Sequence, residues 1–209
     1  MSKAFYHRKK VSFEVTSKGC QDIDEAGLSH SYDLLIQYLS SEDVVLDIAC
    51  GSGKRTCEIA RYVKQVTGIS KSKKKVRLAT WRAEQSQLST LQFHVADVFD
   101  ESISRHKFSA IVALNAFDSG DDPAVIIPQL NRLLASGGKL LLQHPCLGEG
   151  RGLVENIRAL LCGIQWVSPC SSLSVAELEN MVTGANFHIE EGFFTNTVTP
   201  DYFILASKQ

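Results

Sequence analysis

A short glycine-rich turn is the part of the sequence best suited to hold a cofactor. It runs from Asp47 to Gly53 with the sequence DIACGSG and follows the apolar run VVL directly. Glycine lets the backbone approach a ligand closely, and the start of the helix expected after the turn offers unpaired N–H groups. A turn of this kind between a strand and a helix is a site for a phosphate or for a cofactor that carries a nucleoside.

Two nucleotide-binding motifs resemble this turn without matching it. The P-loop pattern G-x-x-x-x-G-K-[ST] requires glycine at Ile48 and a serine or threonine at Arg55, so nucleotide hydrolysis is disfavoured. In the dinucleotide pattern G-x-G-x-x-G, Thr56 stands where a third small residue lets helix and strand pack closely. A dehydrogenase is therefore supported by only two of the three glycines.

The elements that must position the turn alternate between short β-branched runs and helical patterns, which is typical of a parallel α/β sheet. Strands are expected at 44–48, 65–69, 91–95, 109–114 and 139–143, and two closing strands at 187–194 and 202–206. Helices are expected at about 54–63 and 73–85, from Pro123 to the pair Gly137-Gly138, and from Ser174, where Glu177 completes a capping box. Pro128 should bend the third of these helices or mark its true start.

Two segments do not fit this alternation. The first 40 residues contain a helical pattern at about 30–39, and residues 145–172 form a long connection after the fifth strand. Long connections at the carboxyl edge of such a sheet are commonly functional. We therefore expect a single domain over residues 1–209, with 1–40 as a cap and 145–172 as a substrate-side insert.

The turn and the segments that follow it resemble the class I S-adenosylmethionine-dependent methyltransferases. Residues 44–56 are similar to the first motif of that family, an acidic residue followed by x-Gly-x-Gly-x-Gly, here with Ala49 at the first glycine. Further similar segments are VTGISKS at 66–72, VADVF at 95–99, FSAIV at 108–112 and LLASGGKL at 133–140. The resemblance covers roughly residues 40–144. It implies a Rossmann-like three-layer α/β sandwich with seven strands in the order 3-2-1-4-5-7-6, the last strand antiparallel.

The same resemblance implies which residues contact S-adenosylmethionine. Asp47 would accept from the methionine end, and the backbone from Ala49 to Gly53 would lie against the methionine and the ribose. Asp97 would accept from the adenine amino group, with Val98 and Phe99 on or beside the ring. The full set of expected cofactor contacts is Asp47, Ala49, Cys50, Gly51, Gly53, Ser70, Asp97, Val98, Phe99 and Asn115.

One position departs from the family pattern. The family carries Asp or Glu at the end of the second strand, where it accepts both ribose hydroxyls, but Ser70 stands here and Lys71 follows. Losing a charge-assisted hydrogen bond costs on the order of 1.5–3 kcal/mol of affinity. The lysines at 71 and 73–75 suit a solvated surface or a phosphate on the ribose, so an NADP-dependent reductase is the alternative function. A third hypothesis is a binding protein that keeps the fold without catalysis.

Catalytic candidates follow from where ligands bind in open α/β sheets, beyond the carboxyl ends of the strands. Methyl transfer is an in-line displacement that needs a near-attack geometry, and it needs a base only if the acceptor must lose a proton. Asn115, just after the expected fourth strand, would orient the acceptor. His144, just after the fifth, is the candidate base.

Composition limits the partners. A length of 209 residues suits one globular core. The net charge of −1 does not favour nucleic acid as a partner. No apolar run approaches the roughly 20 residues needed to cross a bilayer, and the basic start lacks the apolar stretch of a secretory signal. The six cysteines show no C-x-x-C pair or zinc-finger spacing, so free thiols and no metal site are expected. We expect a cytoplasmic enzyme that acts on a small organic acceptor, and no oligomeric state is predicted.

Overall fold

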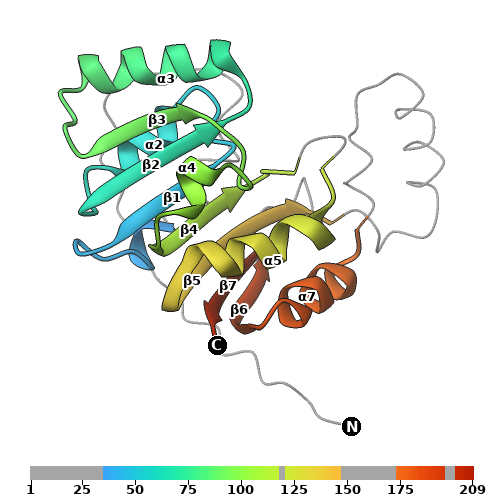
Figure 1. Ribbon diagram of the computed structural model, residues 1–209. Coiled ribbons are helices and arrows are strands. Elements are labelled where there is room, and N and C mark those ends of the chain that lie inside the picture. The colour runs from blue at the N-terminus through green and yellow to red at the C-terminus, as the bar shows by residue number, and fades with distance from the viewer. Residues whose placement is uncertain (1–34, 118–120, 147–172, 196–200) are drawn as a thin grey trace, which may run out of the picture.

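The computed structural model describes residues 35–117, 121–146, 173–195 and 201–209. At its centre is a seven-stranded sheet in the order β3-β2-β1-β4-β5-β7-β6, which Figure 1 shows with its flanking helices. The strands are β1 Val44–Ile48, β2 Gln65–Ser70, β3 Leu91–Val95, β4 Phe108–Leu114, β5 Leu134–Pro145, β6 Phe187–Phe194 and β7 Asp201–Lys208. The first five strands pair in parallel, and β7 is antiparallel to both β5 and β6. The strand order and the antiparallel last strand implied by the methyltransferase resemblance are confirmed.

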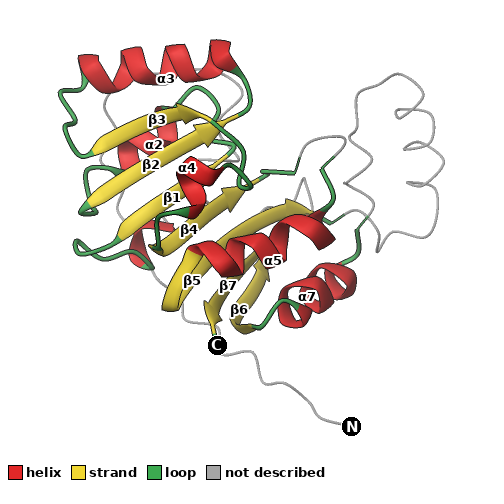
Figure 2. Cartoon of the chain, viewed as in Figure 1, coloured by secondary structure: helices red, strands yellow, loops and turns green. Residues whose placement is uncertain are grey.

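Helices cover both faces of the sheet. They are α2 Lys54–Ile59, α3 Lys73–Gln85, α4 Glu101–Ser104, α5 Pro123–Leu133 and α7 Val175–Gly184. Figure 2 shows α4, α5 and α7 in front of the sheet and α2 behind it. The central strand β1 explains why both faces need cover: Leu46 and Ile48 are buried in the cluster that includes α5 and α7, whereas Val45 is buried on the α2 side. Parallel strands covered on both faces have this near-continuous apolar sequence.

Several helix ends are fixed by local side chains. The capping box expected at Ser174 is present, because the Glu177 N–H donates to Ser174 Oγ at 3.2 Å and the Ser174 N–H donates to Glu177 Oε2 at 2.8 Å. Asp122 caps α5, and Pro123 occupies its first position. Pro128 lies inside α5, so it does not mark the start of the helix.

Three expectations about the elements are corrected. Helix α2 ends at Ile59 rather than at residue 63, and the short helix α4 was not expected. The pair Gly137-Gly138 does not end a helix, because α5 stops at Leu133 and β5 begins at Leu134. Between the pairs Phe108–Leu134 and Ala110–Lys139, β5 contains extra residues, with Gly137 at φ 71°. A glycine with positive φ is typical both of helix ends and of β-bulges, so the sequence pattern alone did not distinguish them.

The expected cap and insert lie largely outside the described residues. Residues 35–37 form a helical turn, and Leu35 is fully buried against the α2 side of the sheet. Among the described residues, no helix is long and apolar enough to cross a membrane. The structure describes Cys50, Cys57 and Cys146, and no disulfide joins any two of them.

Candidate cofactor site

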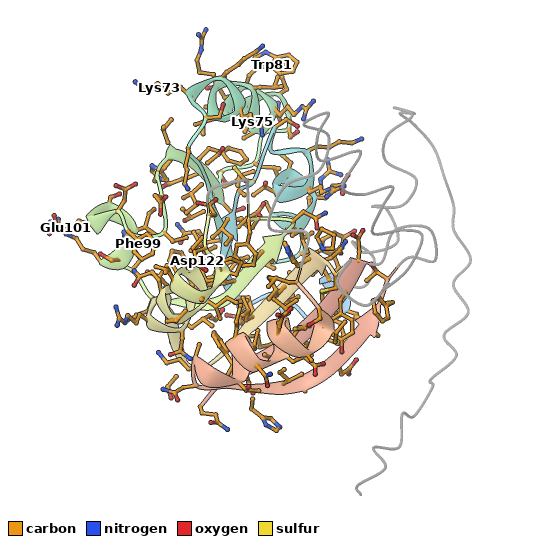
Figure 3. The ribbon with its side chains drawn as sticks, turned by 90° about the vertical axis from the view of Figure 1, so that its right-hand side faces the viewer. Lys73, Lys75, Trp81, Phe99, Glu101 and Asp122 are labelled. Carbon is orange, nitrogen blue, oxygen red and sulfur yellow. The ribbon has the colours of Figure 1, made fainter. Side chains whose placement is uncertain are left out.

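A cavity opens at the carboxyl ends of β1, β2 and β4, and Figure 3 looks onto this edge of the sheet. Strand β1 pairs with β2 on one side and with β4 on the other, so the strand order reverses here. Crevices at such reversals are where open α/β sheets bind ligands. The lining residues are Ile48, Ala49, Ile69, Ser70, Lys71, Ser72, Lys75, Ala96, Asp97, Val98, Asn115, Ala116, Asp121 and Ile126.

The turn after β1 is built from three residues with left-handed backbone. Ala49, Gly51 and Gly53 have φ values of 55°, 57° and 75°. The Cys50 N–H donates to the carbonyl of Ile69 at 3.0 Å, and this bond holds the turn against the end of β2. Ala49 lines the cavity, whereas Cys50, Gly51 and Gly53 lie outside its lining. Of the turn residues predicted to contact the cofactor, Ala49 is therefore the one that lines this cavity.

Gly53 has a packing role that its sequence pattern did not reveal. A Cβ at this position would lie 2.6 Å from the Cβ of Ala79 and 2.7 Å from Cζ of Phe93. At Gly51, by contrast, the nearest described atom to such a Cβ outside the two adjacent residues is the Ala49 carbonyl oxygen, at 3.9 Å. Gly51 is thus required only for its backbone conformation, but Gly53 also lets α3 and β3 pack against the turn.

Asp47 is buried directly beneath the turn, with an exposed fraction of 5%. The Thr56 hydroxyl, from α2, donates to Asp47 Oδ2 at 2.6 Å. Burial raises the pKa of Asp47 to about 7, although the hydrogen bond from Thr56 and the charge of Arg55 both lower it. In the dinucleotide pattern, Thr56 was considered only as the residue that replaces the third glycine. Its hydrogen bond to Asp47 was therefore not anticipated.

Besides Ala49, three more of the predicted cofactor residues line the cavity: Ser70, Val98 and Asn115. Ser70 is largely buried at the end of β2, and its hydroxyl accepts the Ser72 N–H at 3.3 Å. Val98 is buried, and its carbonyl accepts from Gln129 Nε2 at 3.1 Å. Asn115 has a left-handed backbone with φ 48°, and its N–H donates to the carbonyl of Gln143 at 2.9 Å.

Asp97 also lines the cavity and is engaged at both carboxylate oxygens. Its Oδ1 accepts the Phe99 N–H at 3.2 Å, and its Oδ2 lies 3.2 Å from Lys71 Nζ. The same ammonium lies 2.5 Å from Asp121 Oδ1, and the hydrogen bond to Asp121 raises the pKa of Lys71. Asp121 was not recognised in the sequence, because its partner Lys71 lies 50 positions earlier and no short-range pattern connects the two.

Phe99 and His144 are not brought to the cavity. The Phe99 side chain is 52% exposed and, in Figure 3, lies at the outer edge near Glu101. His144 lies inside β5 rather than just after the strand, is 2% exposed, and its ring centroid is 5.5 Å from that of Phe117. Of the two catalytic candidates, only Asn115 lines the cavity.

Arg82 supports the turn from α3. Its Nη1 donates to the Ser52 carbonyl at 3.1 Å and to Ser52 Oγ at 2.5 Å.

Burial and the neighbouring Asp47 raise the pKa of the Cys50 thiol, so Cys50 is a neutral thiol and not an activated nucleophile at neutral pH. In the described part of the chain, no group of three or more His, Cys, Asp or Glu side chains could hold a metal ion.

Comparisons with known proteins agree with this geometry. The profile of a methyltransferase domain family matches residues 39–197, which is more than half of the chain. A ubiquinone biosynthesis O-methyltransferase of Psychrobacter cryohalolentis is 32% identical over 100 residues, which cover 47% of this chain and 39% of that protein. A 23S rRNA (uracil(1939)-C(5))-methyltransferase of Pasteurella multocida is 40% identical over 68 residues, which cover 32% of this chain and 16% of that protein.

A solved structure has the same fold. The crystal structure of a SAM-dependent methyltransferase from Methanosarcina mazei aligns with a TM-score of 0.67 at 24% identity, covering 85% of this chain and 97% of that one. This chain spans less than half the length of the two curated relatives. Because the family profile covers both the turn and the remaining cavity residues, the chain belongs to the methyltransferase domain family.

Proposed function

We propose that this protein transfers the methyl group of S-adenosylmethionine to a small organic acceptor. The observation that carries the proposal is the convergence of Ala49, Ser70, Asp97 and Asn115 on one cavity at the point where the strand order reverses. Membership of the methyltransferase domain family supports the same cofactor. One of the two relatives named above is an rRNA methyltransferase and the other is an O-methyltransferase of ubiquinone biosynthesis. Two observations favour a small organic acceptor over RNA: the net charge of −1, which does not suit binding to many phosphates, and the similarity to the O-methyltransferase.

Ser70 and Asp97, which line the cavity, and the buried Asp47, which precedes the lining residue Ile48, fit the polar groups of this cofactor. The methionine amino group, the ribose hydroxyls and the adenine amino group are all hydrogen-bond donors. The residues proposed to meet them are acceptors: the Asp47 carboxylate, the Ser70 hydroxyl and the Asp97 carboxylate. A buried carboxylate such as Asp47 gains most from a cationic partner, because its charge is poorly solvated on its own. Val98 and Ala116 offer buried apolar surface to the base.

The chain's contribution to the reaction is positioning. The sulfonium supplies an activated methyl group when the cofactor is bound. The turn and Asp47 would hold the methionine end, and Asn115 would orient the acceptor in line with the methyl group. The segments 1–40 and 145–172, largely outside the described residues, are proposed to cover the acceptor within the same domain and exclude water. His144, on the strand that leads into the second segment, stays the candidate base for an acceptor that must lose a proton. We propose a cytoplasmic location for this enzyme.

Calorimetric titration with S-adenosylhomocysteine tests the cofactor, with NADPH titrated in parallel. We expect one-to-one binding of S-adenosylhomocysteine with a micromolar dissociation constant and no binding of NADPH. Binding of NADPH alone would instead support the reductase alternative, in which Lys71 and its neighbours contact a ribose phosphate. Binding of neither ligand would favour a protein that keeps the fold without catalysis.

Ser70→Asp tests the placement of the ribose. Because an aspartate at the end of β2 restores a charge-assisted acceptor, we expect S-adenosylhomocysteine to bind about ten times more tightly. Ser70→Ala is the matched control and should bind more weakly than the wild type, since it removes the hydroxyl. Unchanged or weaker binding by Ser70→Asp, measured by calorimetry at pH 8, would place the ribose away from Ser70.

Arg82→Met tests the support of the turn. Removing both bonds to Ser52 should weaken S-adenosylhomocysteine binding about three- to tenfold and lower the free energy of unfolding by about 1 kcal/mol. Arg77→Met is the control, because Arg77 is exposed on the same helix and outside the cavity lining. Equal effects of the two substitutions on affinity would mean that helix charge, not the turn, is responsible.

A further inference from the structure

Lys71 connects the segments that follow three different strands. It stands directly after β2, Asp97 follows β3, and Asp121 lies between β4 and α5. Its ammonium is 3.2 Å from Asp97 Oδ2 and 2.5 Å from Asp121 Oδ1, and all three residues line the cavity. The bridge therefore lies at the cofactor cavity itself and not on a remote surface.

The bridge is poorly explained as a device for stability. The Lys71 side chain is 59% exposed, and exposed ion pairs contribute little to folding. The Asp121 side chain, in contrast, is only 16% exposed, and that of Asp97 is 33% exposed. Two carboxylates that share one ammonium would repel each other without it. The bridge thus fixes the position of two carboxylates that would otherwise move apart.

Asp97 keeps hydrogen-bonding capacity while it is held in this way. A carboxylate has about four lone-pair sites, and the Phe99 N–H and the Lys71 ammonium use one on each oxygen. The remaining sites can accept from a ligand in the cavity. The two bonds also prevent the carboxylate from rotating toward solvent. The carboxylate is therefore already ordered before the ligand binds, and binding does not carry the entropic cost of ordering it.

We propose that Lys71, braced by Asp121, is a positioning residue for the nucleoside end of the cofactor. It holds the Asp97 carboxylate ready to accept from the amino group of the base and ties the three segments into one wall. This inference rests on the proposed function, because it assumes that an adenosine-bearing ligand occupies the cavity. It gives a role to the lysine that follows Ser70, which the sequence left as either a solvated residue or a phosphate contact.

The experiment compares two ligands and three variants by calorimetry. S-adenosylhomocysteine carries the amino-acid end, whereas 5′-methylthioadenosine carries only the nucleoside. We expect Lys71→Met to weaken the binding of both ligands by the same factor, about tenfold. Lys71→Arg should restore most of the affinity, because the guanidinium still reaches both carboxylates. Lys73→Met is the matched control, since it removes the same charge from a neighbouring exposed lysine outside the cavity lining.

A double-mutant cycle separates positioning from general electrostatics. In an Asp97→Asn background, Lys71→Met should change the affinity less than twofold, because the carboxylate that it positions is gone. Undiminished loss in that background, wild-type affinity in Lys71→Met, or an equal loss in Lys73→Met would each overturn the inference while leaving the proposed function intact. Failure of the wild-type protein to bind either nucleoside would overturn the proposed function and this inference together.

Discussion

Asp47→Asn is expected to weaken S-adenosylhomocysteine binding about 100-fold and to make the protein more stable at pH 8. The loss of affinity follows because a neutral amide replaces the carboxylate proposed to accept from the cationic amino group of the ligand. The gain in stability follows because the carboxylate is buried, and its pKa is raised to about 7 from 3.8. A buried residue kept at a cost to folding is typical of a functional site.

The sign of the pH dependence follows from this raised pKa. The folded protein holds a proton on Asp47 between about pH 4 and pH 7, where the unfolded chain has already released it. Folding stability from this group is therefore full below pH 4 and falls as the pH rises toward 7. Asparagine removes this loss, so the advantage of the variant should appear above pH 4 and reach about 1–3 kcal/mol at pH 8. The gain in stability is smaller than the pKa shift alone implies, because the new amide hydrogens also need acceptors in the buried site.

Urea unfolding at pH 4.5 and pH 8, together with calorimetry, checks both parts. Wild-type affinity for S-adenosylhomocysteine should fall as the pH is lowered below 7, because Asp47 takes up a proton, and the affinity of Asp47→Asn should not follow this trend. A variant that binds as the wild type does would refute the placement of the methionine end. A variant that is less stable than the wild type at pH 8 would refute the assignment of a destabilising buried carboxylate.

Gly53→Ala is expected to destabilise the protein by at least about 3 kcal/mol. The added Cβ would lie 2.6 Å from the Cβ of Ala79 and 2.9 Å from its Cα, so α3 must move away from the turn. The residue also has φ 75°, which by itself disfavours a side chain by about 1–2 kcal/mol. The expected loss in the free energy of unfolding therefore combines the backbone cost of a positive φ with a larger cost from the steric clash.

Gly137→Ala is the control that measures the backbone cost of a positive φ without a steric clash. Gly137 has φ 71°, but within the described part of the chain no atom outside the adjacent residues lies within 4 Å of where its Cβ would be. We therefore expect a loss of only about 1–2 kcal/mol in the control. Urea denaturation of both variants gives the comparison, and a truncation of Phe93 to leucine should recover part of the loss in Gly53→Ala, because Phe93 Cζ lies 2.7 Å from the added Cβ. Equal losses at the two glycines would show that packing at Gly53 is not tight.

Local patterns were sufficient for much of the fold. The predicted boundaries of β1, α3, β3 and β6 agree with the structure, as does the capping box at Ser174. These features depend on residues within a few positions of one another, where alternation, capping and turn chemistry act directly. The strand order did not follow from such patterns but from the resemblance of several segments to the methyltransferases, and the observed sheet has that order.

Strand length and bulges depended on pairing between distant strands. His144 belongs to β5 because β5 pairs with β7 as far as Pro145 and Asp201, 56 positions later in the chain. The bulge at Gly137 likewise arises from the change of register between β4 and β5. Neither partner strand is adjacent in sequence, so the apolar run at 139–143 indicated a strand without indicating where it ends.

The sequence by itself determined the chemical types gathered at the site: a glycine turn, an acidic residue beneath it and a serine in place of the usual ribose acceptor. Only the tertiary structure decided which side chains hold these groups. Arg82 reaches Ser52 across 30 positions and Lys71 reaches Asp121 across 50. The packing of Ala79 against Gly53 is equally non-local. Such contacts are set by strand order and helix packing, which bring distant segments together at one edge of the sheet and leave no short-range pattern in the sequence.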